Sequence, residues 1–395
     1  MAVTVPNDDV IAFRLRAQHL DNRQDEDGLL EATGACGVQN SPPGSARLAL
    51  HARVQGMTAD RLENAVGDKS LLQSWCMRGA PFYIPTTDAP VFTTGVLPPT
   101  EEVMRQFILG AGPTVDKVGL TLTEAVDLTE AEIGEVLTGR RLAIDELGAE
   151  LAQRIAGRLP SEQRTVWEEE GPHAAGQPIG EAVVHFCVRI LTLRGVVCFA
   201  PRVGNKAPFV LVEEWLDQPI PETDPRTARA ELLRRYLRCY GPSTRADFAA
   251  WLGVRTQDAD HWWSLIEDEV TEVEFRRAAW VLTEDLDALR SPPAVRGVRL
   301  LPPRDPYTQL RDRETIVPPA YHREVWKKVG DPGTVMIDGA IVGIWRPRKN
   351  GRRLSITVAT FEALSDRDQQ RVQAEVEQIA PLRGASTAVT EFETA

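Results

Sequence analysis

The feature that most constrains the fold is an order of elements that recurs along most of the chain. Patterns typical of short helices are each time followed by alternating apolar residues around a turn, which predict a β-hairpin. The order occurs in residues 1–97, 98–222 and 223–290. A unit that returns at intervals of roughly 100 residues is typical of a tandem array. Helices followed by a hairpin form a winged helix-turn-helix, so we predict three such units.

Local signals support this order in each unit. In the first, residues 80–95 predict a strand, a turn and a second strand. In the second, Thr129 and Glu132 have the spacing of a capping box at a helix start. Residues 196–215 of the same unit alternate around a Gly-Asn turn, which predicts a hairpin. In the third, the strand pair is predicted at 270–282.

The pattern of residues changes in the C-terminal part, where it predicts a small β-domain. The dipeptides Asp338-Gly339 and Asn350-Gly351 are signals of tight hairpin turns. A helix predicted at 366–379 closes this domain, and a frayed acidic tail is expected from Gly384 onward. We therefore predict an α+β fold in which three tandem winged helix-turn-helix units precede a C-terminal β-barrel-like domain. The expected domains are 1–97, 98–222, 223–290 and 291–384, followed by the tail 385–395.

Composition excludes several classes of protein. The five cysteines are scattered without a CxxC pair, which predicts buried, reduced thiols and no zinc site. No nucleotide-binding or serine-hydrolase motif occurs, so we expect no cofactor and no metal. No apolar run long enough to cross a membrane and no signal peptide is evident, and we expect a cytoplasmic, nucleoid-associated monomer. The net charge of −12 argues against a uniformly basic surface, although cations cluster at 229–238, 311–328 and 346–353.

The stretch from Cys36 to Val54 contains the candidate catalytic residues. A helix ends near Gly37, and the polar bridge Gln39-Asn40-Ser41 follows it. Pro42 and Pro43 then predict a new helix, with Ser41 placed as its N-cap. Polar side chains beside this helix start, with Arg47 and Arg53 on the helix, are suited to an anionic polymer. The alternative is a plain helix connection, in which Gln39 caps backbone groups and the two arginines form surface ion pairs.

Further arginines are candidates for contacts with phosphates. Arg78 follows Trp75 and precedes a predicted strand. Arg245 lies at a helix start after a Tyr-Gly-Pro turn, where helix-turn-helix proteins approach DNA. Simple capping by Ser243 or Thr244 is the interpretation we favour for that helix start.

One predicted turn, at residues 346–353, is unusually cationic. It places five cations within eight residues of an otherwise acidic protein: Arg346, Arg348, Lys349, Arg352 and Arg353. The alternatives are a loop that follows a nucleic-acid groove and a solubilising turn that protects a sheet edge. We favour contact with DNA, and Arg348, Lys349, Arg352 and Arg353 are the residues expected to make it.

Six sequence segments together resemble a known family. They are GVQNSPPGSARLALHARV, SWCMRGAPFYIP, LRGVVCFAPRVGNKAPFVLVEEW, YGPSTRADFAAWLG, RLLPPRDPY and DGAIVGIWRPR. In order and spacing they resemble the AlkZ-like bacterial DNA glycosylases, which unhook interstrand crosslinks and remove bulky alkylpurines, and the resemblance covers nearly the whole chain. It implies three winged-helix units and a C-terminal β-barrel in a C shape whose concave face holds DNA.

The resemblance also implies a catalytic site at the polar bridge. The family's signature of Gln, an aliphatic residue, then Gln or Asp falls on Gln39, Asn40 and Ser41, of which only Gln39 matches. Where the family often carries Thr and His after the Trp-x-x-Arg element, this chain has Ala80 and Phe82. The implied catalytic residues are therefore Gln39 and Ser41.

Three functional hypotheses remain open. The first is a metal-independent DNA glycosylase that acts on alkylated or bulky purine adducts in double-stranded DNA. The second is a non-catalytic winged-helix protein that binds DNA or recognises damage. The third is an acidic chain that meets a protein partner and no DNA, and a continuous positive surface would argue against it.

Overall fold

The computed structural model describes residues 3–327 and 329–394, which form two compact units. The first unit comprises residues 1–68, 233–251 and 266–395, and the second comprises 69–232 and 252–265. Helix α13 (Pro225–Tyr240) runs from the second unit into the first. The boundaries expected from the sequence remain predictions.

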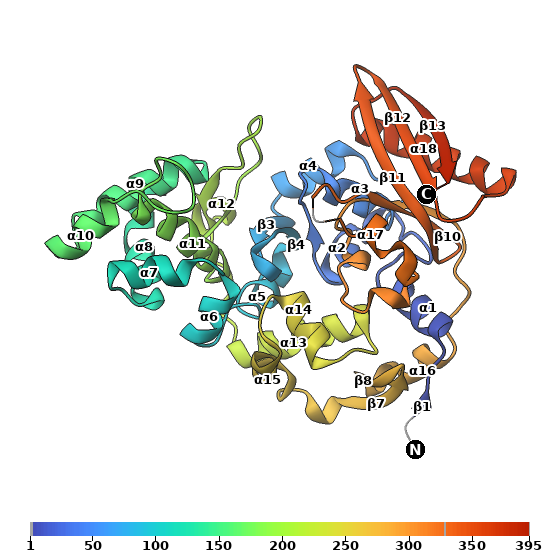
Figure 1. Cartoon of the computed structure of the whole chain (residues 1–395), viewed down its shortest axis with the longest axis horizontal. Helices are drawn as coiled ribbons and strands as arrows, with labels where there is room; N and C mark the ends of the chain where they lie inside the picture. Colours follow the sequence, from blue (N-terminus) through green and yellow to red (C-terminus); the bar gives the residue numbers. More distant parts are fainter. Residues whose placement is uncertain (1–2, 328, 395) are drawn as a thin grey trace. The chain divides into compact units, whose positions relative to one another are not determined.

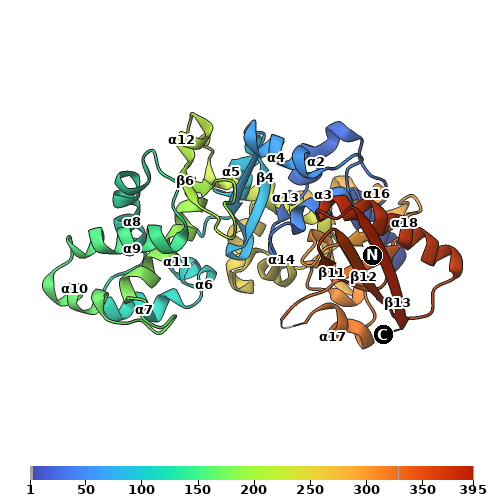
Figure 2. The same ribbon diagram turned by 90° about the horizontal axis from the view of Figure 1, so that it is seen from above.

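Helices dominate the second unit, and Figure 2 shows α7 to α11 as one group. Helices α8, α9 and α11 pack on one another, and α11 also contacts the sheet of this unit. The helices are α5 (Ala89–Phe92), α6 (Glu101–Phe107), α7 (Ala111–Val118), α8 (Leu122–Leu137), α9 (Ile144–Ala156), α10 (Ser161–Glu168), α11 (Ile179–Leu193), α12 (Val212–Leu216) and α15 (Asp260–Trp263).

The capping box predicted at Thr129 is wrong. The box lies eight residues earlier, where Thr121 accepts from the amide of Glu124 and the Glu124 carboxylate accepts from the amide of Thr121. Thr129 is inside α8 instead, where its hydroxyl donates to the carbonyl of Ala125. A buried threonine is tolerated there because this bond satisfies its hydroxyl. The sequence offers two similar signals, and the earlier one begins the helix.

The sheet of the second unit contains two hairpins. One matches the hairpin predicted at 196–215, and the other lies at 71–85 instead of the predicted 80–95. Strands β3 (Leu71–Trp75) and β4 (Pro81–Pro85) pair antiparallel, and β3 also pairs with β5 (Val197–Phe199). Strand β6 (Phe209–Leu211) pairs with β5 as predicted, with the turn at Gly204. The second strand expected within 80–95 is a 3₁₀ turn followed by α5. Strand β3 was not recognised because Leu71 to Ser74 are all buried, which removes the alternation.

A five-stranded sheet with a long helix against it forms the C-terminal part of the first unit (Figure 1). The strand order is β13 (Thr387–Thr394), β12 (Arg353–Thr360), β11 (Ala340–Asn350), β10 (Gly333–Ile337) and β9 (Val298–Leu301). Helix α18 (Asp366–Leu382) buries Val372, Val376 and Ile379 against Leu354, Ile356 and Val358 of β12. The apolar residues of α18 recur with helical spacing and those of β12 recur at every second position, and both sets face the same core.

This sheet corrects two predictions. The sheet is open, with edge strands β9 and β13 in the described residues, so the expected barrel is wrong. The expected frayed tail is also wrong, because residues 387–394 form β13, parallel to β12; Ala395 lies outside the described residues. Ala388 and Phe392 of β13 pack on the core, while Glu391 and Glu393 occupy the other face. Charged residues are typical of an edge strand, and here the glutamates make the apolar face of β13 hard to recognise in the sequence.

A smaller sheet and a group of helices complete the first unit. Strand β1 (Val3–Thr4) runs parallel to β7 (Val270–Phe275), and β7 pairs antiparallel with β8 (Arg277–Leu282), as predicted for 270–282. Their shared core includes side chains from two helices of the same unit. The helices are α1 (Asn7–Ala17), α2 (Leu29–Gly34), α3 (Ser45–His51), α4 (Ala59–Gly67), α14 (Arg245–Leu252), α16 (Leu286–Arg290) and α17 (His322–Val325).

A buried carboxylate joins α18 to α3. Glu375 is only 4% exposed, and its Oε1 lies 2.5 Å from Nη2 of Arg23 and 3.4 Å from Nε2 of His51. Burial raises the pKa of this carboxyl, but the hydrogen bond from His51 and the charges of Arg23, His51 and Arg299 outweigh it, so the pKa is lowered overall.

We expect Glu375→Gln to lower the free energy of unfolding by about 2 kcal/mol at neutral pH, because a charged hydrogen-bond acceptor is lost. The folded state favours the carboxylate, so the difference from the wild type should be full above the unfolded pKa. It should shrink as the pH falls through the folded pKa. Urea unfolding of both proteins between pH 7 and pH 3 measures this. A difference that grows on acidification would contradict the assignment.

Candidate active site

The polar bridge connects strand β2 (Val38–Gln39) to helix α3 in the first unit. Helix α3 begins at Ser45, and its N-cap is Gly44 with φ +90°. The predicted helix start at Pro42, with Ser41 as N-cap, is therefore wrong. The physical reason is a turn over 40–44: Oδ1 of Asn40 accepts from the amide of Gly44 at 2.8 Å, and glycine alone readily adopts the left-handed geometry needed there.

Gln39 is held at the start of this turn. It is 3% exposed, and its carbonyl accepts a hydrogen bond from the Ser45 hydroxyl at 3.1 Å. Asn40 is 7% exposed and occupied by the turn, whereas Ser41 is half-buried. The three residues offer an amide, a second amide and a hydroxyl, with no carboxylate. Such a set can orient a water or a sugar oxygen, but an amide cannot take a proton from it.

Arg53 is not a surface residue. It is 2% exposed, and its Nη1 and Nη2 each lie 2.8 Å from a carboxylate oxygen of Asp305. Burial lowers the pKa of the Arg53 guanidinium, but the charge and hydrogen bonds of Asp305 outweigh it and raise the pKa overall. Contact of Arg53 with a phosphate stays a prediction, and it would require the buried pair between its Nη1 and Nη2 and Asp305 to open.

Arg47 remains accessible. Its side chain is 27% exposed, its Nη2 lies 3.7 Å from Glu63, and its Nη1 donates to the carbonyl of Leu382 at 3.1 Å. A surface ion pair is the alternative that the sequence leaves open for Arg47, and the pair with Glu63 is of this kind. It is long and half-exposed, so a phosphate could replace it at little cost.

The cationic turn lies at the tip of the β11–β12 hairpin, where every residue from Arg346 to Arg353 is exposed. The register pairs Arg348 with Ser355 and Asn350 with Arg353, so that the arginines of β11 and Arg353 share one face of the sheet. The two turn residues are Gly351 and Arg352, one position later than predicted. Over residues 3–327 and 329–394, none of the four predicted phosphate ligands of this hairpin forms an ion pair.

One cation near this hairpin was not predicted. Arg383 follows the last residue of α18, and its Nε is buried without a hydrogen-bond partner in the described structure. Burial lowers the pKa of its guanidinium. Arg47 bonds to the preceding carbonyl, and a Cβ on Gly384 would lie 3.1 Å from Nζ of Lys349. We call Arg47, Lys349 and Arg383 the helix-end cluster; only tertiary folding gathers residues so far apart in sequence.

Arg78 belongs to the second unit, in the turn between β3 and β4. Its φ is +57°, and its guanidinium lies 5.9 Å from the ring centre of Phe82. A Cβ on Gly253 would lie 3.0 Å from the Arg78 Cα, so glycine is required there. Arg189 of α11 was not predicted; it lies 5.6 Å from the ring centre of Trp75, and burial lowers its pKa.

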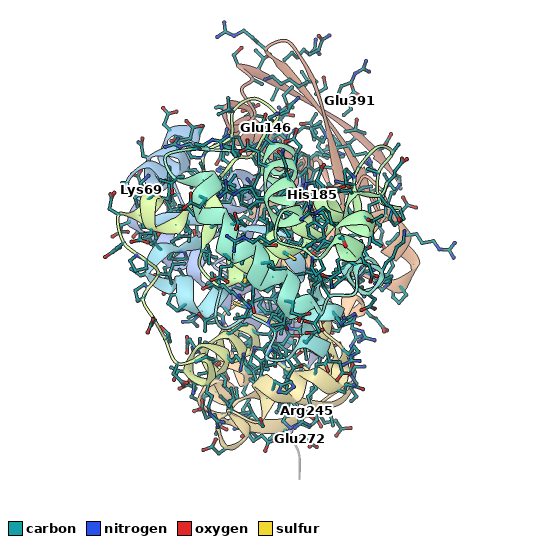
Figure 3. All side chains as sticks on the ribbon, turned by 90° about the vertical axis from the view of Figure 1, so that its left-hand side faces the viewer. Lys69, Glu146, His185, Arg245, Glu272 and Glu391 are labelled. Atoms are coloured by element: carbon teal, nitrogen blue, oxygen red, sulfur yellow. The ribbon has the colours of Figure 1, made fainter. Side chains whose placement is uncertain are left out.

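Arg245 begins α14 and is labelled in Figure 3. Its side chain is 39% exposed and lies 3.1 Å from Glu267. The hydroxyl of Thr244 accepts from the amide of Asp247 at 3.2 Å, so capping by Thr244 is confirmed. A role of Arg245 in DNA binding stays a prediction.

Several expectations concern the chain as a whole. All five cysteines are buried and free, as predicted. Of the residues described, no group of three or more His, Cys, Asp or Glu side chains is arranged to hold a metal ion. Nor does any described helix have the length and apolar character needed to span a membrane.

Comparison with known proteins finds similar proteins over most of the chain. The family model "DNA glycosylase AlkZ-like" matches residues 32–382. An interstrand DNA cross-link repair glycosylase from Streptomyces sahachiroi is 28% identical over 349 residues, which cover 85% of this chain and 86% of that protein. The solved structure of Streptomyces sahachiroi DNA glycosylase AlkZ has a TM-score of 0.76 to this chain, with 24% identity, and covers 99% of it and 100% of its own length. The last comparison shows a shared fold.

Proposed function

Because the chain belongs to the AlkZ-like DNA glycosylase family, we propose that it binds double-stranded DNA and hydrolyses the N-glycosidic bond of alkylated or bulky purine adducts. The observation that carries this proposal is the burial of Gln39, the last residue of β2, whose backbone carbonyl accepts from the hydroxyl of Ser45 at the start of α3. The family's DNA-repair function makes DNA the expected partner. We further propose that residues 1–97, 98–222 and 223–290 act as winged-helix units.

The chemistry of the adduct fits the modest polarity of this site. An N7- or N3-alkylated purine carries a positive charge, so the base leaves as a neutral molecule with the electrons of the bond to C1′. The sugar then has oxocarbenium character and accepts a water, which loses a proton. Gln39, assisted by Ser41, would orient that water or a sugar oxygen. The leaving group needs no strong acid, so the bridge's lack of a carboxylate is compatible with this reaction.

Base release from duplex DNA is the direct test. Duplexes that carry an N7-alkylguanine or an N3-alkyladenine are incubated with the protein, and the free base is quantified by chromatography. We expect release well above the spontaneous rate, unaffected by a chelator. Release at the spontaneous rate for every alkylpurine tested, by a protein that unfolds cooperatively, would contradict the proposed activity.

The second candidate function is a damage-binding protein without catalysis. Its support is the departure at Asn40 and Ser41 from the pattern that the family resemblance implies, together with the use of Asn40 in a turn. The two functions give different results in one experiment. A damage binder retains tight, salt-dependent affinity for the alkylated duplex and releases no base.

The β11–β12 hairpin and the helix-end cluster are the proposed phosphate contacts of the first unit. We expect replacement of Arg348, Lys349, Arg352 and Arg353 by Ala to weaken duplex binding. The magnitude of the slope of log K against log salt should fall by about 3.6, because each of the four lost phosphate contacts removes about 0.9. Fluorescence anisotropy between 50 and 300 mM salt measures the slope. A matched variant with Ala at the exposed residues Arg290, Arg296, Arg323 and Arg367 should keep it. An equal loss in both variants would contradict a specific role of the hairpin.

A further inference from the structure

A cavity of about 430 Å³ opens at the carboxyl end of α3, the end opposite to Ser45 and its bond to Gln39. All of its walls belong to the first unit. Its polar lining comes from Arg23, His51, Gln55, Arg299 and Gln378. None of these five residues was assigned a role by the sequence or in the proposed reaction.

Arg299 of β9 is the unusual member of this lining. It is 7% exposed, and its Nε and Nη1 each donate to a backbone carbonyl at 2.9 Å, those of Ala52 and Val298. It forms no ion pair with any described residue. Burial, followed by the charge of Arg23, lowers its pKa to about 10. The two carbonyls accept two of its five N–H hydrogens and leave its charge uncompensated, which is costly for a buried guanidinium.

The neighbouring charges do not compensate Arg299. The buried carboxylate of Glu375 is in contact with Arg23 and His51. The charge of Arg53 also lowers the pKa of Arg299, but Arg53 is itself paired with the carboxylate of Asp305. Asp21 and Glu375 act on Arg299 only through longer-range attraction. The lining of the cavity therefore contains two guanidiniums and no carboxylate.

We propose that this cavity binds a phosphate group. Two guanidiniums present planar N–H groups that match the oxygens of a tetrahedral oxyanion, and the amides of Gln55 and Gln378 can add neutral donors. The volume exceeds that of one phosphate, so the group would enter with part of the molecule that carries it. That molecule is either a DNA backbone or a free phosphomonoester. The inference does not depend on the proposed reaction at Gln39.

The test compares two substitutions of the same kind on α18. Gln378→Glu places a carboxylate at the cavity and should supply the missing negative charge. Gln370→Glu places the same charge on an exposed position of the same helix. Inorganic phosphate binding is measured by isothermal titration calorimetry at constant ionic strength set with chloride. We expect binding to the wild type and to Gln370→Glu, and at least tenfold weaker binding to Gln378→Glu. Arg299→Met, checked for cooperative unfolding, should also lose it.

The outcomes are separable from those of the base-release assay. No phosphate binding by the folded wild type, or equal binding by the wild type and Gln378→Glu, would overturn the site even if base release is normal. A second titration identifies the source of the phosphate. Displacement of phosphate by undamaged duplex DNA identifies the DNA backbone, whereas displacement by a nucleoside monophosphate alone identifies a free phosphomonoester.

Discussion

Replacement of Gln39 by Ala should lower the rate of base release by at least about 100-fold, within the range for loss of a group that positions a reacting water or proton. Gln39 is 3% exposed and lies where β2 passes into the turn before α3, and the neighbouring amide of Asn40 is engaged with Gly44. Single-turnover release of an alkylated base, with enzyme in excess, measures the chemical step without product release.

Matched variants separate chemistry from folding. Ser41→Ala removes a half-buried hydroxyl from the same bridge and should cost no more than about tenfold. Asn40→Ala removes the bond to the amide of Gly44 and should lower stability as well as activity. Gln39→Ala should leave duplex affinity within about twofold of the wild type. If Gln39→Ala releases base at the wild-type rate, the proposed catalytic role of this residue is wrong, whatever the protein binds.

Local signals in the sequence predicted those parts of the fold that depend on neighbouring residues. The turn at Asp338-Gly339 is an example: both residues have positive φ, 49° and 90°, as the hairpin signal requires. Ser365 accepts from the amide of Asp368 at 3.1 Å, at the start of the helix predicted from residue 366. Such features depend on a few consecutive residues, and those residues are visible in the chain.

The errors arose where distant segments decide the structure. Strand β13 forms because β12 offers a free edge and α18 an apolar face, and nothing in residues 387–394 alone reveals either. Arg383 joins the helix-end cluster only because folding brings Arg47, which is far away in the sequence, to the carbonyl of Leu382, the residue before Arg383. The candidate site followed the same rule: the sequence located Gln39, but the capping role of Ser41 was wrong because Asn40 and Gly44 form the turn.

The largest expected effect on stability belongs to Arg53. We expect Arg53→Met to lower the free energy of unfolding by about 3–5 kcal/mol, because the carboxylate of Asp305 would remain buried without its partner. Asp305 also accepts from the amide of Tyr307 at 2.9 Å, so the ion pair fastens the loop after β9 to the end of α3. Urea unfolding should show a lower midpoint with an unchanged m-value.

Two comparisons show whether Arg53 has this structural role or contacts DNA. The double variant Arg53→Met/Asp305→Leu removes both charges and should recover most of the lost stability, since the uncompensated carboxylate is gone. Arg47→Met, at a half-exposed position on the same helix, should cost less than about 1 kcal/mol but reduce the salt slope of duplex binding. If Arg53→Met were as stable as the wild type yet reduced that slope, Arg53 would be a phosphate ligand. The buried pair with Asp305 would then have to open when DNA binds.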